Sequence, residues 1–390
     1  MNSTGDNKAE GVTNSRGTRS EKLTGAAIKL VRNVPGLKQS VLSGVAFLTK
    51  HETGYLHAKL KKEEEINLDL SKKCDELTSL VASVGKHVES EKALNRYIKT
   101  ETAAVRRMMF VEKQHQKVER NFPKYAKYLP KAEPLDAKLT AALNEKIAPV
   151  IVFTHIQKTA GNSVIAFLQR CLSTPRVARI HELEMASRET IKGAIDSKFG
   201  LYDVMSGHIP FARRIDLLLD RPNVNISIMR EPVDRVVSLY FYLKANESWL
   251  EQGKYVTQNN LSLLEFATSE AYFDNHMVRM LCDLEPTSVP IGQCSEEMLE
   301  QAKINIVKNF LLVGLTEKIN EFLEVLAHIF CWSLEDVPRE NVNELRSPIS
   351  KFPTDVLDAV AERNKYDVAL YKFAKEYWEK MTDSFSEGRI

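Results

Sequence analysis

Two short segments carry side chains suited to binding phosphate or sulfate groups. The first places Lys158, Thr159 and Ser163 between an apolar run at Val150–Thr154 and an apolar-periodic stretch. A helix starting there offers free backbone N–H groups and the positive end of its dipole, to which an ammonium and hydroxyl groups add. The Lys precedes the Gly, so the segment is not a Walker A loop. The sequence therefore predicts an anion-binding loop made of Lys158, Thr159, Ala160, Gly161, Asn162 and Ser163.

The second segment is REPVDRVVS, in which Arg230 follows an apolar run and Ser238 lies eight residues later, about two helical turns on. A guanidinium binds phosphate through charge and a fork of N–H donors, and a serine hydroxyl can donate one more hydrogen bond. The alternative is a structural Arg230 that caps a strand or pairs with Glu231 or Asp234. Two anion sites indicate a ligand with two anionic ends.

His208, which follows Gly207, is the candidate general base. An imidazole that titrates near neutrality can accept a proton from a hydroxyl under attack. Glu182 and Glu184 are rival bases, and a purely structural histidine is the third alternative. No Cys/His cluster or HExxH pattern is present in the sequence, which predicts no metal site.

The elements that must position these residues alternate along the chain. Short apolar runs predict strands, and each is followed by a stretch with helical periodicity. Such alternation is typical of an α/β fold with a parallel sheet covered by helices on both faces. Ligands of open α/β sheets bind outside the carboxyl ends of the strands, so both anion-binding segments can face one ligand. The predicted strands are Val150–Thr154, Val204–Met205, Ile226–Met229 and Phe310–Val313.

Three motifs carry a resemblance to a known family. HIQKTAGNS resembles the 5′-phosphosulfate loop, and REPVDRVVSLYFYL the 3′-phosphate motif, of the carbohydrate sulfotransferases that use 3′-phosphoadenosine 5′-phosphosulfate (PAPS). SGHIPF is similar to the Gly-His segment that carries the catalytic base in the heparan sulfate 2-O-sulfotransferases. The sequence most resembles the group that contains the heparan sulfate 2-O- and 6-O-sulfotransferases and related bacterial proteins. The resemblance covers roughly Ala148 to Trp378 and implies a P-loop NTPase-like sheet.

The resemblance implies an enzyme that moves a sulfuryl group from PAPS to a hydroxyl of a saccharide, either a polysaccharide or a glycolipid, by in-line displacement. Lys158 and His208 would be catalytic, and PAPS would be the donor without any metal. Asn275 and Arg279, four residues apart, would contact an acidic sugar or a sulfate of the glycan if they share a helix face. Two alternatives remain open: a nucleotide-dependent phosphotransferase, and an inactive helical scaffold that binds nucleotide.

The N-terminal part lies outside the resemblance. Polar residues 1–22 predict a disordered tail, and residues 23–120 a helical extension. Apolar residues spaced three and four apart between Leu56 and Met109, without proline, predict a long helix. It either forms a coiled coil or hairpin that makes a homo-oligomer, or folds back onto the catalytic domain. Residues 121–147 are expected to be a linker with a short helix, and residues 148–390 the sulfotransferase domain.

The composition indicates which partners and which cellular compartment to expect for this protein. A net charge of +2 gives no reason to expect nucleic acid. The most apolar early run, Ser40–Leu48, is much shorter than the ~20 residues that span a bilayer, although a helix within 25–49 could contact a membrane surface. Animal members of the family are generally Golgi enzymes with a membrane anchor. Because the sequence shows neither anchor nor signal pattern and its five cysteines are scattered, it predicts a soluble, cytoplasmic enzyme of bacterial type.

Overall fold

The computed structural model describes residues 91–131, 148–172, 174–180, 183–184, 186–198, 201–246, 250–270, 272–333 and 349–386. Contacts divide the chain into two units, residues 1–108 with 133–146 and residues 109–132 with 147–390. Of the first unit, only residues 91–108 are described, and they form the first part of helix α4 (Glu91–Asn121). The predicted tail and most of the predicted coiled coil therefore lie outside the described residues, and self-association stays a prediction.

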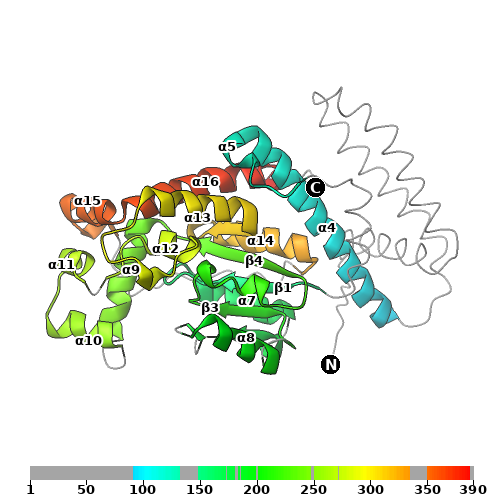
Figure 1. Ribbon diagram of the computed structural model, residues 1–390, viewed down its shortest axis with the longest axis horizontal. Helices are drawn as coiled ribbons and strands as arrows, with labels where there is room; N and C mark the ends of the chain where they lie inside the picture. Colours follow the sequence, from blue (N-terminus) through cyan, green and yellow to red (C-terminus); the bar gives the residue numbers. More distant parts are fainter. Residues whose placement is uncertain are drawn as a thin grey trace, which may run out of the picture. The chain divides into compact units, whose positions relative to one another are not determined.

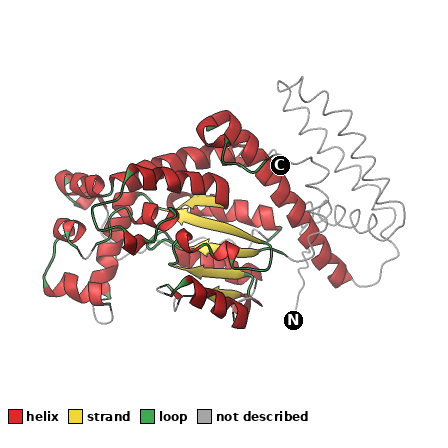
Figure 2. Ribbon diagram, in the orientation of Figure 1, coloured by secondary structure: helices red, strands yellow, loops and turns green. Residues whose placement is uncertain are grey.

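The second unit is built on a five-stranded parallel sheet, shown in Figures 1 and 2. The strand order is β2-β3-β1-β4-β5, and each neighbouring pair is parallel. This confirms the predicted α/β class with a parallel sheet flanked by helices. The strands are β1 (Val150–Thr154), β2 (Val177–Arg179), β3 (Val204–Gly207), β4 (Asn223–Met229) and β5 (Phe310–Leu315).

The central strand β1 is buried on both faces, which is why its sequence is a continuous apolar run. Ile151 and Phe153 belong to one apolar cluster, together with Phe167 of helix α7 (Gly161–Leu172). Val150 and Val152 belong to a second cluster, which includes Ile191 of helix α8 (Arg188–Ser197). Successive side chains of a strand point to opposite faces, so the alternation shows that both faces of the sheet are covered.

Further helices complete the unit. Four of them enclose a third apolar cluster beside the sheet, namely α9 (Pro232–Ala245), α10 (Glu251–Gln258), α11 (Leu263–Thr268) and α15 (Thr354–Arg363). The remaining helices are α5 (Pro123–Ala126), α12 (His276–Leu281), α13 (Glu296–Asn309), α14 (Ile319–Phe330) and α16 (Lys365–Ser386). Short 3-10 helices occur at Thr174–Arg176, Phe211–Arg213, Ile215–Leu217, Pro286–Ser288, Thr316–Lys318 and Ile349–Lys351.

Residues 109–132 belong to the unit that contains the sheet. The Gln114 amide donates a 3.1 Å hydrogen bond to the carbonyl of Leu311 in β5. The buried Phe122 ring packs on Phe373 and Tyr377 of α16, with ring centroids 5.6 and 5.5 Å apart. The second half of α4 is thus fixed against the edge strand β5 and α16. In the ranges that the structure covers, no helix combines the length and apolar character needed to cross a membrane.

Candidate active site

The loop that carries Lys158 begins at the centre of the sheet. β1 ends at Thr154, which lies opposite Gly207 of β3 and Ser227 of β4. The Ser227 hydroxyl donates a 2.8 Å hydrogen bond to the Thr154 carbonyl, and the backbone N–H of His155 donates to the Gly207 carbonyl at 3.1 Å. The chain passes from β1 toward β2 on one side and later returns to β4 on the other. Such a switch point is where open parallel sheets bind ligands.

The loop between β1 and α7 has a tightly defined conformation. Lys158 and Ala160 both lie in the left-handed region, with φ of 66° and 62°. The Thr159 side chain is buried, and its hydroxyl donates a 2.8 Å hydrogen bond to the Ile156 carbonyl. A Cβ atom on Gly161 would lie 2.0 Å from the ring of His155, so only glycine fits at the start of α7. The Thr159 hydroxyl therefore supports the loop from inside, while the helix N-terminus offers N–H groups without intrahelical partners.

The second predicted motif meets this loop directly. Arg230 follows β4, and its Nη1 donates a 3.1 Å hydrogen bond to the Lys158 carbonyl. The same guanidinium pairs with Asp234 at 2.6 Å, so the ion pair weighed from the sequence is present. Burial lowers the pKa of the Arg230 guanidinium from its ordinary value. Asp234 and the Lys158 carbonyl together fix the orientation of the Arg230 side chain.

The Lys158 ammonium lies against helix α9. Its Nζ is 3.8 Å from the centroid of the Tyr242 ring, a cation–π contact. Ser238 precedes Tyr242 by four residues in α9, and residues four apart share one face of a helix. The Lys158 ammonium and Ser238 therefore lie on the same side of α9, as expected if both face one ligand.

His208 immediately follows β3 and has a defined tautomer. Its Nδ1 lies 2.6 Å from the His155 carbonyl oxygen, which can only accept, so Nδ1 carries the proton and donates it. The lone pair of the neutral ring is then on Nε2. The backbone N–H of His208 donates a 3.2 Å hydrogen bond to the Glu184 carboxylate. Glu184, one of the two rival candidate bases, therefore holds the backbone at His208. The other rival, Glu182, lies outside the described residues.

His208 lines a cavity of about 240 Å³ between the sheet ends and the helices α9 and α12. Gln157 of the Lys158 loop also lines it, so the cavity adjoins this loop. Arg213 crosses one wall and pairs with Glu285 through two hydrogen bonds of 3.0 and 3.2 Å. The other lining residues are Glu184, Pro210, Arg235, Leu239, Gln252, Tyr272, Phe273, His276, Met280, Pro286 and Thr287.

Asn275 and Arg279, predicted from the resemblance to contact the glycan, lie elsewhere. Both are buried, and neither lines the cavity. Arg279 donates to Asp274 and to the carbonyls of Pro286, Val289 and Pro290. The oxygen of the Asn275 side chain accepts from the backbone N–H groups that begin α16, those of Tyr366 and Asp367. The Asn275 side chain thus joins the start of α12 to α16, and the Arg279 side chain joins α12 to Asp274 and to the segment Pro286–Pro290. The polar residues that line the cavity nearby are Arg235, Tyr272 and His276.

Sequence reasoning left Arg235 and His276 unassigned, although one signal was available for Arg235. It lies in the stretch from Val233 to Val237 of α9, where Asp234 is the only other charged residue. A charged residue within an apolar helix face is rarely buried without a specific role. His276 lies next to the predicted Asn275 and has no comparable signal in the sequence.

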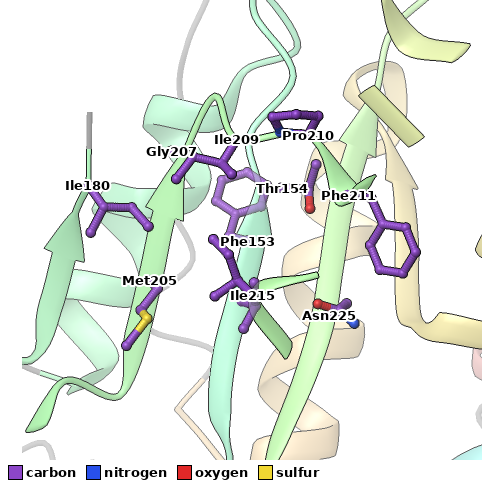
Figure 3. A pocket seen from close by; sticks show the side chains of 11 residues that line it. Phe153, Thr154, Ile180, Met205, Gly207, Ile209, Pro210, Phe211, Ile215 and Asn225 are labelled. Carbon is purple, nitrogen blue, oxygen red and sulfur yellow. The ribbon is translucent and has the colours of Figure 1, made fainter. Parts of the chain in front are cut away.

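A second, smaller void lies against the sheet and is shown in Figure 3. Its volume is about 10 Å³, close to what one water molecule needs. The labelled side chains around it are mostly apolar, among them Phe153, Met205, Ile209 and Ile215. It is a packing gap and too small for a ligand. Among the described residues, no group of three or more His, Cys, Asp or Glu side chains could hold a metal ion.

Several known proteins are similar to this chain in sequence. The family model described as galactose-3-O-sulfotransferase matches residues 103–390, well over half of the chain, and begins well before the segment that carries the motifs. A heparin sulfate O-sulfotransferase of Drosophila melanogaster is 26% identical over 245 residues, which is 56% of this chain and 63% of that protein. Heparan sulfate 2-O-sulfotransferase 1 is 22% identical over 309 residues in Homo sapiens and 20% over 308 in Pongo abelii, in both cases covering 71% of this chain and 85% of the relative.

The comparisons correct one expectation. The prediction of a cytoplasmic enzyme is wrong, because the relatives are animal heparan sulfate O-sulfotransferases, the group whose members are generally Golgi enzymes. The prediction depended on the scattered cysteines and on the start of the sequence, and neither feature identifies a compartment.

Proposed function

Because the chain belongs to the galactose-3-O-sulfotransferase family, we propose that it moves a sulfuryl group from PAPS to a hydroxyl of a glycan. Membership and the relatives support a carbohydrate sulfotransferase. One observation carries the finer proposal: the Lys158 loop, Arg230 and His208 come together at the carboxyl ends of β1, β4 and β3, linked by the hydrogen bonds to the carbonyls of Lys158 and His155.

The residues at this edge fit a donor with two anionic ends. The start of α7 offers the backbone N–H groups of Ala160, Gly161 and Asn162, since that of Ser163 already donates a 3.0 Å hydrogen bond to the Ala160 carbonyl. With the positive charge of Lys158, these groups would hold the 5′ end. Arg230 and Ser238 would hold the 3′-phosphate. The bound nucleotide would supply the activated sulfuryl group. The loop after the central strand of a parallel sheet also supports the P-loop NTPase-like fold that the resemblance implies.

The reaction assigns each group one task. The oxygen of the acceptor hydroxyl attacks the sulfur and forms the new S–O bond, while the bond between sulfur and the bridging phosphate oxygen breaks. His208 accepts the hydroxyl proton at Nε2, and the His155 carbonyl stabilises the resulting imidazolium through Nδ1–H. Lys158 leaves the Tyr242 ring and places its ammonium by the departing oxygen, where negative charge develops. Adenosine 3′,5′-bisphosphate and a sulfate ester are the products.

A titration tests the donor site first. The protein is titrated calorimetrically with adenosine 3′,5′-bisphosphate, with ATP and AMP as competitors. We expect selective binding, and a loss of about tenfold or more in affinity in both Lys158→Ala and Arg230→Ala, because each removes a charge-assisted contact. Lys254→Ala, which changes an exposed lysine of α10, is the matched control and leaves affinity unchanged.

Each other outcome favours a different function for this protein. If ATP binds as well as the bisphosphate, the nucleotide-dependent phosphotransferase moves ahead. If the nucleotide binds but His208→Gln leaves every measured property unchanged and no glycan accepts sulfate, the inactive scaffold is favoured. If no nucleotide binds, the proposal is wrong.

A further inference from the structure

His155, the residue that follows β1, is buried between the two halves of the candidate site. Its side chain is 6% exposed. One edge of its ring lies against Gly161 at the start of α7, where a Cβ atom would come within 2.0 Å of both Cδ2 and Nε2. The first N–H groups of α7 are those that would hold the 5′ end of the donor. The His155 ring therefore packs against the donor side of the site.

The same residue packs against the proposed base. The ring centroids of His155 and His208 are 4.3 Å apart, and the two planes are inclined by 42°. The backbone N–H of His155 donates to the Gly207 carbonyl at 3.1 Å, and the His155 carbonyl accepts from Nδ1 of His208 at 2.6 Å. His155 thus holds the base through its backbone and also contacts it with its ring.

A third contact fixes the orientation of the His155 ring. Phe153 lies two residues earlier in the chain, and its ring is stacked on that of His155, with centroids 5.4 Å apart and an interplanar angle of 14°. Phe153 is itself 1% exposed and belongs to the apolar cluster beneath α7. Because buried side chains are close-packed, a displacement of the His155 ring away from Gly161 is felt at His208.

We propose that the His155 imidazole is a positioning residue that sets the distance between the donor-binding start of α7 and the base His208. The inference rests on the proposed function, since it concerns the reaction at the same site. In-line transfer requires the acceptor oxygen at His208 and the sulfur at the Lys158 loop to approach within about 3 to 3.5 Å. A misplacement of about 1 Å can reduce the rate about 100-fold, so a rigid ring between the two groups suits this task.

Two single substitutions disturb the contact from opposite sides. His155→Ala removes the ring and keeps the backbone hydrogen bonds to Gly207 and His208. We expect kcat for sulfuryl transfer to fall about 10- to 100-fold, while affinity for adenosine 3′,5′-bisphosphate stays within about threefold, because the N–H groups of α7 remain. Gly161→Ala adds a Cβ atom that pushes the ring toward His208, and it should lower kcat at least as much. The φ of Gly161 is not positive, so alanine can adopt its backbone conformation.

The double variant His155→Ala/Gly161→Ala provides the sharpest comparison. The new Cβ atom then occupies space that the ring has left, so we expect kcat within about threefold of His155→Ala alone. Independent contributions would instead multiply, to a loss of about 100-fold or more. Gly193→Ala in α8 is the matched control and should leave kcat unchanged, since a Cβ atom there meets nothing within 4 Å. Binding of adenosine 3′,5′-bisphosphate shows that a variant is folded. If His155→Ala does not fold, His155→Asn, which removes the outer ring atoms, takes its place.

A spectroscopic measurement separates positioning from a general loss of stability. In ¹⁵N NMR of the histidine side chains, with His208 assigned through His208→Gln, we expect the wild-type His208 signals to shift when adenosine 3′,5′-bisphosphate binds. In His155→Ala the nucleotide still binds, and this shift should be at least halved.

Three results would each overturn the inference: an unchanged kcat in His155→Ala, losses that multiply in the double variant, or an equal shift of the His208 signals in both proteins. Failure of the proposed function is recognised in the wild type instead, which then binds no adenosine 3′,5′-bisphosphate and transfers no sulfate. Failure of the inference leaves both of these wild-type activities intact.

Discussion

Two buried arginines lie on neighbouring helices and have opposite surroundings. Arg279 in α12 has all its nitrogens engaged, by Asp274 and four backbone carbonyls. Arg235 in α9 has one engaged nitrogen and faces a cavity. Both side chains are at most 1% exposed, so burial alone does not separate a structural arginine from one available to a ligand. The two arginines are separated by how many of their guanidinium N–H donors have a hydrogen-bond partner.

The largest expected effect is on Arg279. Replacing it with Met leaves the buried Asp274 carboxylate without its counter-ion and several carbonyls without donors, so we expect a loss of about 3 to 5 kcal/mol in the free energy of unfolding. Urea denaturation measures it. Lys192→Met, which breaks an exposed i,i+4 pair, should cost less than about 1 kcal/mol. A small loss in Arg279→Met would mean that satisfied donors do not mark structural arginines here.

The second prediction concerns His208, which lines the same cavity as Arg235. Gln in its place can still donate to the His155 carbonyl but cannot act as a base, so we expect sulfuryl transfer to fall about 100- to 1,000-fold while stability stays within about 0.5 kcal/mol. Initial rates with labelled PAPS and urea denaturation give both values. Unchanged transfer would assign the base to another residue, and a large loss of stability would make His208 structural.

The smallest effect concerns Asp367, which connects the two regions. Burial raises the pKa of its carboxyl to about 6, against an ordinary value of 3.8. The folded protein then binds more protons than the unfolded chain between these values, so the contribution of Asp367 to stability is complete below about pH 4 and is lost as the pH rises through 6. Asp367→Asn should remove this slope, on the order of 2 kcal/mol between pH 4 and 6. Urea denaturation at pH 4, 5, 6 and 7 measures it, and parallel curves for the two proteins would contradict the assignment.

The strands that position the site were readable from the sequence because each is buried on both faces. β1 and β5 are near-continuous apolar runs, and β3 and β4 contain shorter ones beside Ser206, Asn225 and Ser227. Polar residues follow the ends of these strands. β2 was missed, since three residues give no periodicity to recognise. The strand order also could not be read, because it depends on contacts between residues far apart in the chain.

Local sequence pattern singled out the Lys158 loop and His208, whereas it gave no indication of the cavity. Asn275 and Arg279 share a short segment with His276, and the sequence alone does not tell which of the three faces a ligand. The answer depends on Asn364 and Asp367, which accept the backbone N–H groups of Asn275 and Val278 across about 90 residues, and on Asp274, which accepts from the Arg279 guanidinium. Hydrogen-bond satisfaction is a property of the folded chain, so a resemblance of motifs cannot supply it.

The backbone of the Lys158 loop has a consequence for nucleotide affinity. Lys158 and Ala160 occupy the left-handed region without being glycine, each at a cost of about 1 to 2 kcal/mol that the fold must overcome. Fixing the backbone of one residue costs roughly 1 to 2 kcal/mol in conformational entropy. Because the Thr159 and Arg230 contacts already hold these residues, that loss occurs when the chain folds. A ligand meets a preorganised loop, and the ordering cost is not subtracted from its binding energy.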